Sequence, residues 1–284
     1  MLATLGYLGG GAGPPRDRKL PDPRGLIELV TAAHRASELA ADGRCSEALE
    51  ALRPVLRRAP HAVAPANLAG MCLLRQGEVE RALGLFRRAA RLAPALAAPH
   101  ANAGGALLRL GRRTEARQEL ELALRLDPAE GSAAAALARL HREEGETLKA
   151  VEVLENAIAA GAREAEVFLE LGISRAVLGR LPRAMDAFRE AARRDPTSIV
   201  ALENAARAAY HLGRVRESAG FYRRALRVAP DRWDLWRTLG AIYLDVLDDR
   251  DEALRCFRRA LANAPPGPDR ATLEEMVRQL RAGR

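Results

Sequence analysis

The chain has 284 residues and a formal net charge of +8, and 48% of its residues are hydrophobic while only 4% are aromatic. Alanine is abundant and β-branched residues are sparse, which favours closely packed helices over a β-sheet, and no apolar run approaches the length of a membrane-spanning helix. The basic residues are almost all arginine, with lysine only at Lys19 and Lys149, so the positive charge either marks an acidic partner or reflects the codon usage of a GC-rich genome.

Residues 1–28 are rich in Gly and Pro, and we expect a flexible N-terminal segment there. The segment lacks the basic start and the long apolar stretch of a secretory signal peptide. The cytoplasm is therefore the default location, an expectation that would change if Met1 were not the true start and the chain were a fragment of a larger protein.

From residue 29 onward one sequence pattern returns with a period of 34 residues. Each repeat has a small residue at its eighth place, Gly at the fifteenth, Ala at the twentieth, a large apolar residue at the twenty-fourth, Ala at the twenty-seventh and Pro at the thirty-second. The fifth repeat carries the pattern most completely, with Phe168, Leu171, Gly172, Gly179, Ala184, Phe188, Ala191 and Pro196. The seven predicted repeats are residues 29–62, 63–96, 97–130, 131–164, 165–198, 199–232 and 233–267.

Several repeats depart from the pattern at single places. The first has Arg35 at a usually apolar place and Val55 in place of Ala, and the fourth has Ala162 in place of Pro. In the sixth, Ser218 stands where Ala is usual, and the seventh has one extra residue in the turn at 246–250. We expect these departures to alter local geometry rather than the fold.

Each recurring residue has a physical reason. A small residue at the eighth place lets the two helices of a pair approach closely. Gly at the fifteenth place can take a positive φ and end the first helix, and Pro at the thirty-second place cannot continue the second. Ala at the twentieth place packs back on the first helix, where a larger side chain would overpack. Each repeat is therefore predicted as a helical hairpin, which buries its apolar face only by stacking on its neighbours.

The last segment, residues 268–284, is predicted as one more amphipathic helix with a short tail. Leu273, Met276, Val277 and Leu280 fall on one face of that helix, and charged residues fall elsewhere. Such a helix suits a cap that covers the end of the stack and keeps its outer face in water.

The residues of this pattern resemble the tetratricopeptide repeat family, whose motif is W-x2-L-G-x2-Y, then A-x3-F, then P. The resemblance covers residues 29–267. It implies an all-α fold, a right-handed α-solenoid superhelix of seven helix–turn–helix repeats with a C-terminal capping helix. It also implies a non-catalytic protein–protein interaction scaffold, in which the first helices of the repeats build a concave groove that binds a peptide segment of a partner.

The groove places of the family are filled here mainly by basic and amide side chains. The candidate peptide-binding residues are Asn67, Met71, Arg75, Asn102, Arg109, Arg139, Arg142, Asn204, Arg207, Tyr210 and Arg237. Because a side-chain amide both donates and accepts, Asn102 and Asn204 are suited to bond the backbone of an extended peptide. We expect a protein or peptide partner with an acidic or amphipathic segment, although the same residues would also suit a merely solvated wall.

The chain carries no motif of a catalytic, cofactor-binding or metal-binding site, so we expect neither enzyme activity nor a cofactor. The Gly-rich run at 9–15 leads into Pro and Arg and not into the helix of a phosphate-binding loop. None of the five histidines has metal-ligand spacing, and His141 lies on a charged helix face. The three cysteines, Cys45, Cys72 and Cys256, are far apart and read as small core residues.

Two alternative functions stay open, as does self-association. Residues 2–11 are similar to the linker of bacterial proteins in which tetratricopeptide repeats follow a sulfatase-like domain, which would make the chain a detached accessory region of such a hydrolase. Nucleic-acid binding is less expected, because the double-Arg steps such as Arg223-Arg224 are not interleaved with aromatic residues for base stacking. The end repeats also leave room for self-association.

Overall fold

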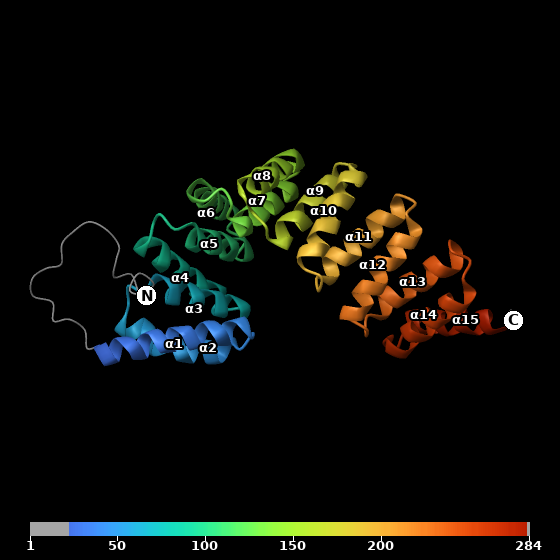
Figure 1. The fold of residues 1–284 in the computed structure, drawn as a ribbon, viewed down its shortest axis with the longest axis horizontal. Helices are drawn as coiled ribbons and strands as arrows, with labels where there is room; N and C mark the ends of the chain where they lie inside the picture. Colours follow the sequence, from blue (N-terminus) through green and yellow to red (C-terminus); the bar gives the residue numbers. More distant parts are fainter. Residues whose placement is uncertain (1–22, 283–284) are drawn as a thin grey trace, which may run out of the picture. The chain divides into compact units, whose positions relative to one another are not determined.

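The structure is a computed structural model that describes residues 23–282. Within these residues it consists of fifteen α-helices and no β-strand (Figure 1). The helices are α1 (Pro23–Ala41), α2 (Cys45–Arg58), α3 (Val63–Arg75), α4 (Val79–Leu92), α5 (Ala97–Arg109), α6 (Arg113–Leu126), α7 (Gly131–Glu143), α8 (Thr147–Ala160), α9 (Ala165–Val177), α10 (Leu181–Arg194), α11 (Ile199–His211), α12 (Val215–Val228), α13 (Trp233–Asp245), α14 (Arg250–Asn263) and α15 (Pro268–Ala282). The predicted all-α fold of successive helical hairpins with a final helix is confirmed.

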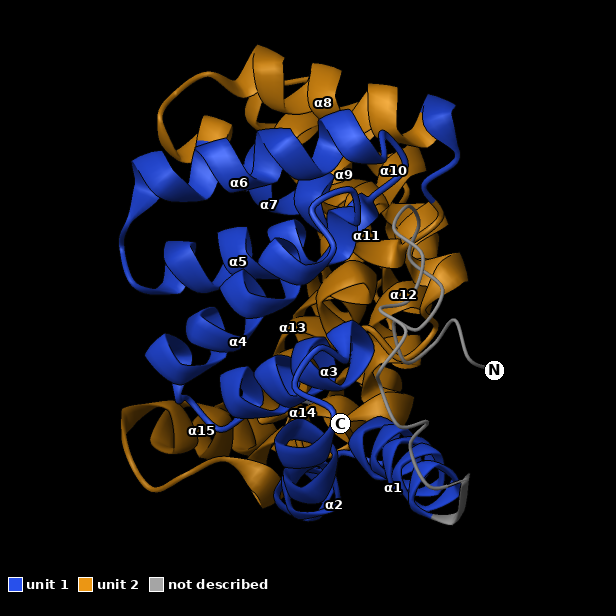
Figure 2. Ribbon diagram, turned by 90° about the vertical axis from the view of Figure 1, so that its left-hand side faces the viewer, with its two compact units in different colours: residues 1–140, 159–162 blue, residues 141–158, 163–284 orange. Residues whose placement is uncertain are grey.

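The chain divides into two compact units, residues 1–140 with 159–162 and residues 141–158 with 163–284 (Figure 2). In the first unit, α1 packs on α2, α3 on α4 and α5 on α6, and the hairpins join where α2 meets α3 and α4 meets α5. In the second unit, α9 to α14 pair in the same way, and α15 packs on α14. Within each unit the main packing partners of a helix are therefore the helices next to it in the sequence.

The two helices of a pair approach most closely at the eighth place of the repeat. A Cβ atom built on Gly172 would lie 2.4 Å from Cδ1 of Phe188, and one on Gly70 would lie 2.5 Å from Cε1 of Phe86. Both distances are well below the separation of carbon atoms in contact. The aromatic ring at the twenty-fourth place thus occupies the space that a side chain at the eighth place would need, as the sequence predicts.

In every hairpin before the last one, the turn is closed by glycine in a left-handed conformation, for example Gly77 with a φ of 82°. Beyond it, the Glu78 N–H donates to the Leu73 carbonyl at 2.9 Å, and the Gly77 N–H donates to that of Leu74 at 3.3 Å. These bonds satisfy carbonyls that the end of α3 would otherwise leave unpaired.

The turn between α13 and α14 is built differently, because it is one residue longer and has no glycine. Asp248 adopts the left-handed conformation there, with a φ of 51°, which aspartate tolerates better than most residues. The next residue, Asp249, accepts the Glu252 N–H at 3.0 Å through its carboxylate and caps the start of α14.

The core is built mainly of alanine and leucine around a few aromatic rings, of which Phe86 and Phe257 are fully buried. Two hydroxyl groups break this apolar interior. Ser174 and Ser218 are fully buried, and neither side-chain oxygen has a hydrogen-bond partner in the described part of the chain. An unpaired buried hydroxyl costs free energy of folding, so both serines are local weak points of the core.

Helices α1 and α15 lie at the two ends of the described part of the chain. Helix α1 already begins at Pro23, inside the segment 1–28 that we expected to be flexible, because proline is well suited to the first residue of a helix. Residues 1–22, including the linker-like residues 2–11, lie outside the described part. At the other end, Leu273, Val277 and Leu280 of α15 are buried, as predicted for an amphipathic helix.

None of the described helices is both long and apolar enough to cross a membrane.

Candidate functional site

The candidate groove residues all lie on the first helices of the hairpins. Helix α3 carries Asn67, Met71 and Arg75, α5 carries Asn102 and Arg109, α7 carries Arg139 and Arg142, α11 carries Asn204, Arg207 and Tyr210, and α13 carries Arg237. Residues up to Arg139 belong to the first unit, and Arg142 onward belong to the second. Each group is therefore a candidate surface of its own unit.

In the first unit, the structure brings two predicted residues into direct contact. The Asn102 side-chain amide donates to Oδ1 of Asn67 at 3.0 Å, which links α5 to α3. Each amide is half-buried and can form further hydrogen bonds, since the NH2 group of Asn67 and the side-chain oxygen of Asn102 are not used in this contact. The pair can offer both a donor and an acceptor to a bound backbone. Met71, 41% exposed, lies one helical turn after Asn67.

The two arginines predicted for this surface have a structural role that the sequence did not reveal. Arg75 donates to the Ala40 carbonyl, and Arg109 donates to the Leu74 carbonyl, both at 2.9 Å. These carbonyls lie in the last turn of the preceding first helix, where a cation is favourable for the helix dipole. Each arginine thus joins two hairpins, and it remains exposed with other N–H groups available to a ligand.

In the second unit, Arg142 is largely taken up by a buried ion pair. Its Nη2 donates to Oε2 of Glu170 at 2.9 Å, and the two side chains are only 23% and 8% exposed. Its Nε is buried and has no hydrogen-bond partner among the described residues. Arg142 is therefore part of the interior of this unit rather than an open contact for a partner.

Two more candidates are held by contacts of their own. The Asn204 amide donates to the Val200 carbonyl of its own helix at 2.9 Å. The Arg237 guanidinium donates to Asp269 of α15 at 3.2 Å and lies 5.4 Å from the centroid of the Trp233 ring. Both residues support the local structure, and their contacts do not indicate a role in ligand binding.

Arg207 and Tyr210 do line a hollow, which we call the α11–α13 hollow. Its volume is about 170 Å³, and its lining residues are Arg207, Tyr210, His211, Tyr222, Thr238, Ala241, Ile242 and Asp245. Tyr210 is 43% exposed, and its ring meets that of His211 edge-on at 6.0 Å. Burial, followed by the charge of Glu203, raises the pKa of Tyr222, so this phenol stays neutral.

Charges of both signs surround the α11–α13 hollow. Arg207 forms no hydrogen bond or ion pair within the described residues, and Asp245 is exposed across from it on α13. Sequence reasoning did not single out Thr238 and Ala241, which line the hollow from α13. Their short side chains gave no chemical signal.

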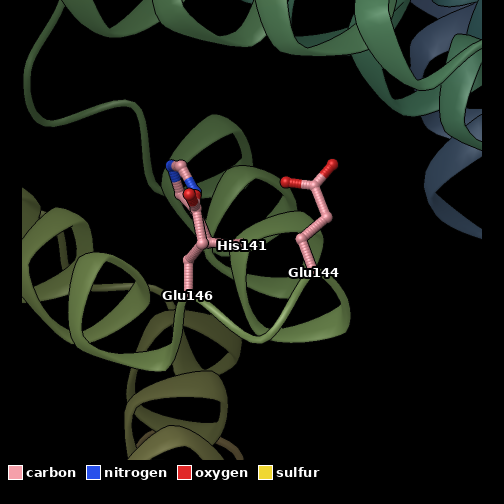
Figure 3. Close-up of side chains that lie close together, drawn as sticks. All are labelled: His141, Glu144 and Glu146. Atoms are coloured by element: carbon pink, nitrogen blue, oxygen red, sulfur yellow. The ribbon is translucent and has the colours of Figure 1, made fainter.

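A cluster of His141, Glu144 and Glu146 lies where α7 ends and α8 begins (Figure 3). The buried His141 ring shares a hydrogen bond of 2.7 Å between Nδ1 and Oε2 of Glu146. The same carboxylate accepts from the Lys149 ammonium at 2.8 Å, and these two contacts, that of Lys149 first, lower the pKa of Glu146. Because Lys149 already compensates this carboxylate, the contact of His141 with Glu146 is explained as part of a polar network between two helix ends.

Models of the tetratricopeptide repeat match residues 35–97, 97–130, 135–199 and 203–268. Because these matches begin at residue 35, they give no support to the resemblance of residues 2–11 to a sulfatase linker. None of the curated proteins matches the chain.

Three solved structures illustrate the likeness of the fold. One is the APC/C hetero-tetramer Cut9–Hcn1, with a TM-score of 0.62 and 15% identity over 93% of this chain and 50% of that chain. A second is pilF of Pseudomonas aeruginosa, with a TM-score of 0.61 and 17% identity over 78% of this chain and 97% of that chain. A third is the C-terminal part of a repeat protein from Cytophaga hutchinsonii, with a TM-score of 0.56 and 17% identity over 84% of this chain and 98% of that chain. At such identities the likeness concerns the fold alone.

Proposed function

Because the chain belongs to the tetratricopeptide repeat family, we propose that it is a non-catalytic scaffold that binds a peptide segment of a protein partner. Repeat proteins of this kind use extended surfaces built by successive units for binding. The first helices of the hairpins carry the contact residues in this proposal, with one surface in each compact unit.

The observation that carries the proposal is the α11–α13 hollow. Tyr210 offers an exposed aromatic ring, and Arg207 offers a guanidinium without an ion pair, side by side on α11. Tyrosine and arginine are among the residue types that most often dominate the binding energy of interfaces. Ala241 and Ile242 supply an apolar wall, so the hollow suits one apolar or aromatic side chain of a partner.

The charges around the hollow favour a partner with an acidic residue next to that anchor. Arg207 and His211 are one turn apart on α11 and would face such a carboxylate, while Asp245 on α13 disfavours it at the other side. In the first unit, the Asn67–Asn102 amide pair is the corresponding place where a peptide backbone would bond. The proposed ligand is therefore an amphipathic or acidic segment of a protein.

The test is affinity capture from a lysate of the source cells, with Arg207→Glu/Tyr210→Ala compared with the wild type by mass spectrometry. The matched control is Arg91→Glu/Leu92→Ala on α4, since both residues there are exposed and the chemical changes are of the same kind. Melting curves verify that both variants are folded.

A protein captured by the wild type and the control, but lost from the Arg207→Glu/Tyr210→Ala variant, would support the proposal. A synthetic peptide from that protein should then bind the purified chain directly. Equal capture by both variants, or capture of nucleic acid alone, would show that the proposed surface does not carry the function.

A further inference from the structure

A second hollow, on the other helix of the sixth hairpin, is lined by arginines and aromatic rings. We call it the α12 hollow. Its volume is about 750 Å³, and its lining residues are Glu217, Gly220, Phe221, Arg223, Arg224, Leu226 and Arg227 of α12 and Trp236 of α13. It shares no residue with the α11–α13 hollow of the proposed function.

The charge of the α12 hollow is strongly positive once its existing ion pairs are counted. The carboxylate of Glu217 is taken up by Arg189 of α10, at 2.8 Å from its Nε and 2.5 Å from its Nη2. Arg224 is held in the wall, since it donates to the Ala192 carbonyl at 3.2 Å and lies 5.4 Å from the centroid of the Phe221 ring.

Arg223 and Arg227, by contrast, are exposed and form no hydrogen bond or ion pair within the described residues. They are one turn apart on α12, so their guanidinium groups can reach the same anion.

Comparison with other repeats shows which partner Arg223 lacks. At the same place of the second and fifth repeats, Arg87 bonds Glu115 at 2.8 Å, and Arg189 bonds Glu217. Each of these carboxylates lies at the nineteenth place of the next repeat. In the seventh repeat, with its extra turn residue counted, that place is Glu252, which bonds Arg255 of its own helix at 2.6 Å instead.

Aromatic rings lie in the same hollow, which corrects the expectation that no ring accompanies these arginines. Trp236 is half-buried, and its indole N–H is already donated to the Pro230 carbonyl at 2.9 Å. The ring therefore has only apolar and π surface left for a ligand. Sequence reasoning missed this neighbour because Trp236 belongs to the next repeat.

Guanidinium groups beside an aromatic ring are the chemistry that holds a phosphate and stacks a base. We propose that the α12 hollow binds a nucleoside phosphate, with the phosphate on Arg223 and Arg227 and the base against Trp236. The ligand is either a free nucleotide or one nucleotide of a single strand, and the chemistry of recognition is the same for both.

Gly220 allows a test that leaves the charge unchanged. It lies in the middle of α12, and a Cβ atom built there would meet nothing within 4 Å, so the position opens into the hollow. A leucine at this position should project into the hollow and obstruct the space beside the arginines without disturbing the fold. Gly84 of α4 occupies the same place in the second repeat and is equally open, so Gly84→Leu is the matched control.

The binding experiment uses the full chain, a labelled short single-stranded oligoadenylate read by anisotropy, and ATP as competitor. Arg223→Glu/Arg227→Glu should weaken binding by about tenfold or more, because two charge-assisted contacts are lost and repulsion replaces them. The control Arg53→Glu/Arg57→Glu on α2 changes the same two places of the first repeat. The following repeat has Ala66 at the place where Trp236 follows α12, so no aromatic ring accompanies these arginines, and the control should leave binding nearly unchanged. Gly220→Leu should weaken binding, and Gly84→Leu should not.

The chain has only two tryptophans, so in Trp233→Phe the emission of Trp236 alone reports on the base, and it should be quenched by the ligand. Competition by ATP at equal phosphate concentration identifies a free nucleotide as the ligand, and its failure identifies a strand. The proposal is overturned by absence of binding, by equal loss in the two arginine double variants, by unchanged binding of Gly220→Leu, or by an oligoglutamate peptide that competes as well as the oligonucleotide.

Discussion

The space above Gly172 is filled by the ring of Phe188, whose Cδ1 lies 2.4 Å from the point where a Cβ atom would stand. This relationship fixes how closely α9 and α10 pack, and it recurs between Gly240 and Phe257, where the shortest distance is 2.7 Å. The first prediction follows from it. Gly172→Ala should lower the free energy of unfolding by about 1–3 kcal/mol, since the ring must move out of a packed core.

A glycine-to-alanine substitution in open space should instead raise the free energy of unfolding. At Gly84 a Cβ atom meets nothing within 4 Å, so Gly84→Ala should stabilise the protein by up to about 1 kcal/mol through helix propensity alone. Urea titrations followed by circular dichroism measure both. If the two variants shifted the midpoint in the same direction, close packing at the eighth place would not be the reason for glycine there.

The second prediction concerns the twentieth place, where Ser218 has a buried hydroxyl without a partner and Ala116 is fully buried. Ser218→Ala should stabilise the protein by about 1 kcal/mol, because it removes an unpaired polar group. Ala116→Ser should destabilise it by about 1–3 kcal/mol for the same reason. Thermal melts of the two single variants decide the matter, and a destabilised Ser218→Ala would mean that the hydroxyl has a partner, such as a bound water.

The third prediction concerns the Arg142–Glu170 ion pair. Arg142→Leu should cost about 1–3 kcal/mol, because it takes a charge-assisted partner from a carboxylate that is 8% exposed. In the double variant Arg142→Leu/Glu170→Leu the loss should be smaller, since no buried charge is left behind. A double-mutant cycle in urea gives the coupling energy, and a value near zero would show that the pair contributes nothing to stability.

The fourth prediction concerns pH. The Arg193 guanidinium, and next that of Arg194, lower the pKa of Glu190 from 4.5 to about 2 against the effect of burial. A carboxyl group whose pKa is lower in the folded state stabilises it fully above the unfolded pKa, and this contribution is lost as the pH falls from about 4.5 towards 2. Glu190→Gln should therefore have a shallower loss of stability over this range, by less than about 1 kcal/mol, because Arg193 is mostly exposed. Unfolding curves at a series of pH values, with Glu80→Gln on the exposed surface as control, provide the measurement.

The fifth prediction concerns the thiols. Burial raises the pKa of Cys72 to about 11 and that of Cys256 to about 12, so almost no thiolate is present near neutral pH. Both residues should resist iodoacetamide in the native protein and react in urea, as read by intact mass. Rapid native labelling at either cysteine would mean that the helix which carries it opens readily.

The sequence was a sufficient guide to the fold because its signals are local. Glycine at the eighth and fifteenth places and the aromatic residue at the twenty-fourth each act within one hairpin, and Gly77 and the Gly172–Phe188 pair behave as their positions predict. Because the 34-residue period repeats these signals in successive hairpins, the prediction of the fold rests on many positions and not on one.

The candidate site was harder to predict because its contacts cross from one hairpin to the next. That Arg109 bonds the Leu74 carbonyl, or that Arg142 pairs with Glu170, depends on which rotamers the stacked neighbours leave free. The same holds for Trp236, which reaches the arginines of α12 from the following helix. No spacing within a repeat encodes these partners.

The packing of helices on their neighbours in sequence also bears on how the protein reaches its native state. Because the contacts between helices within a unit join mainly helices that are adjacent in sequence, the loops that they close are short, and little chain entropy is lost before a contact forms. Folding can begin at any hairpin and proceed by adding the next one, as in a one-dimensional lattice with nearest-neighbour coupling. A hairpin that holds a buried hydroxyl without a partner, such as α11–α12 with Ser218, then contributes less free energy to this growth than it would with alanine at that place.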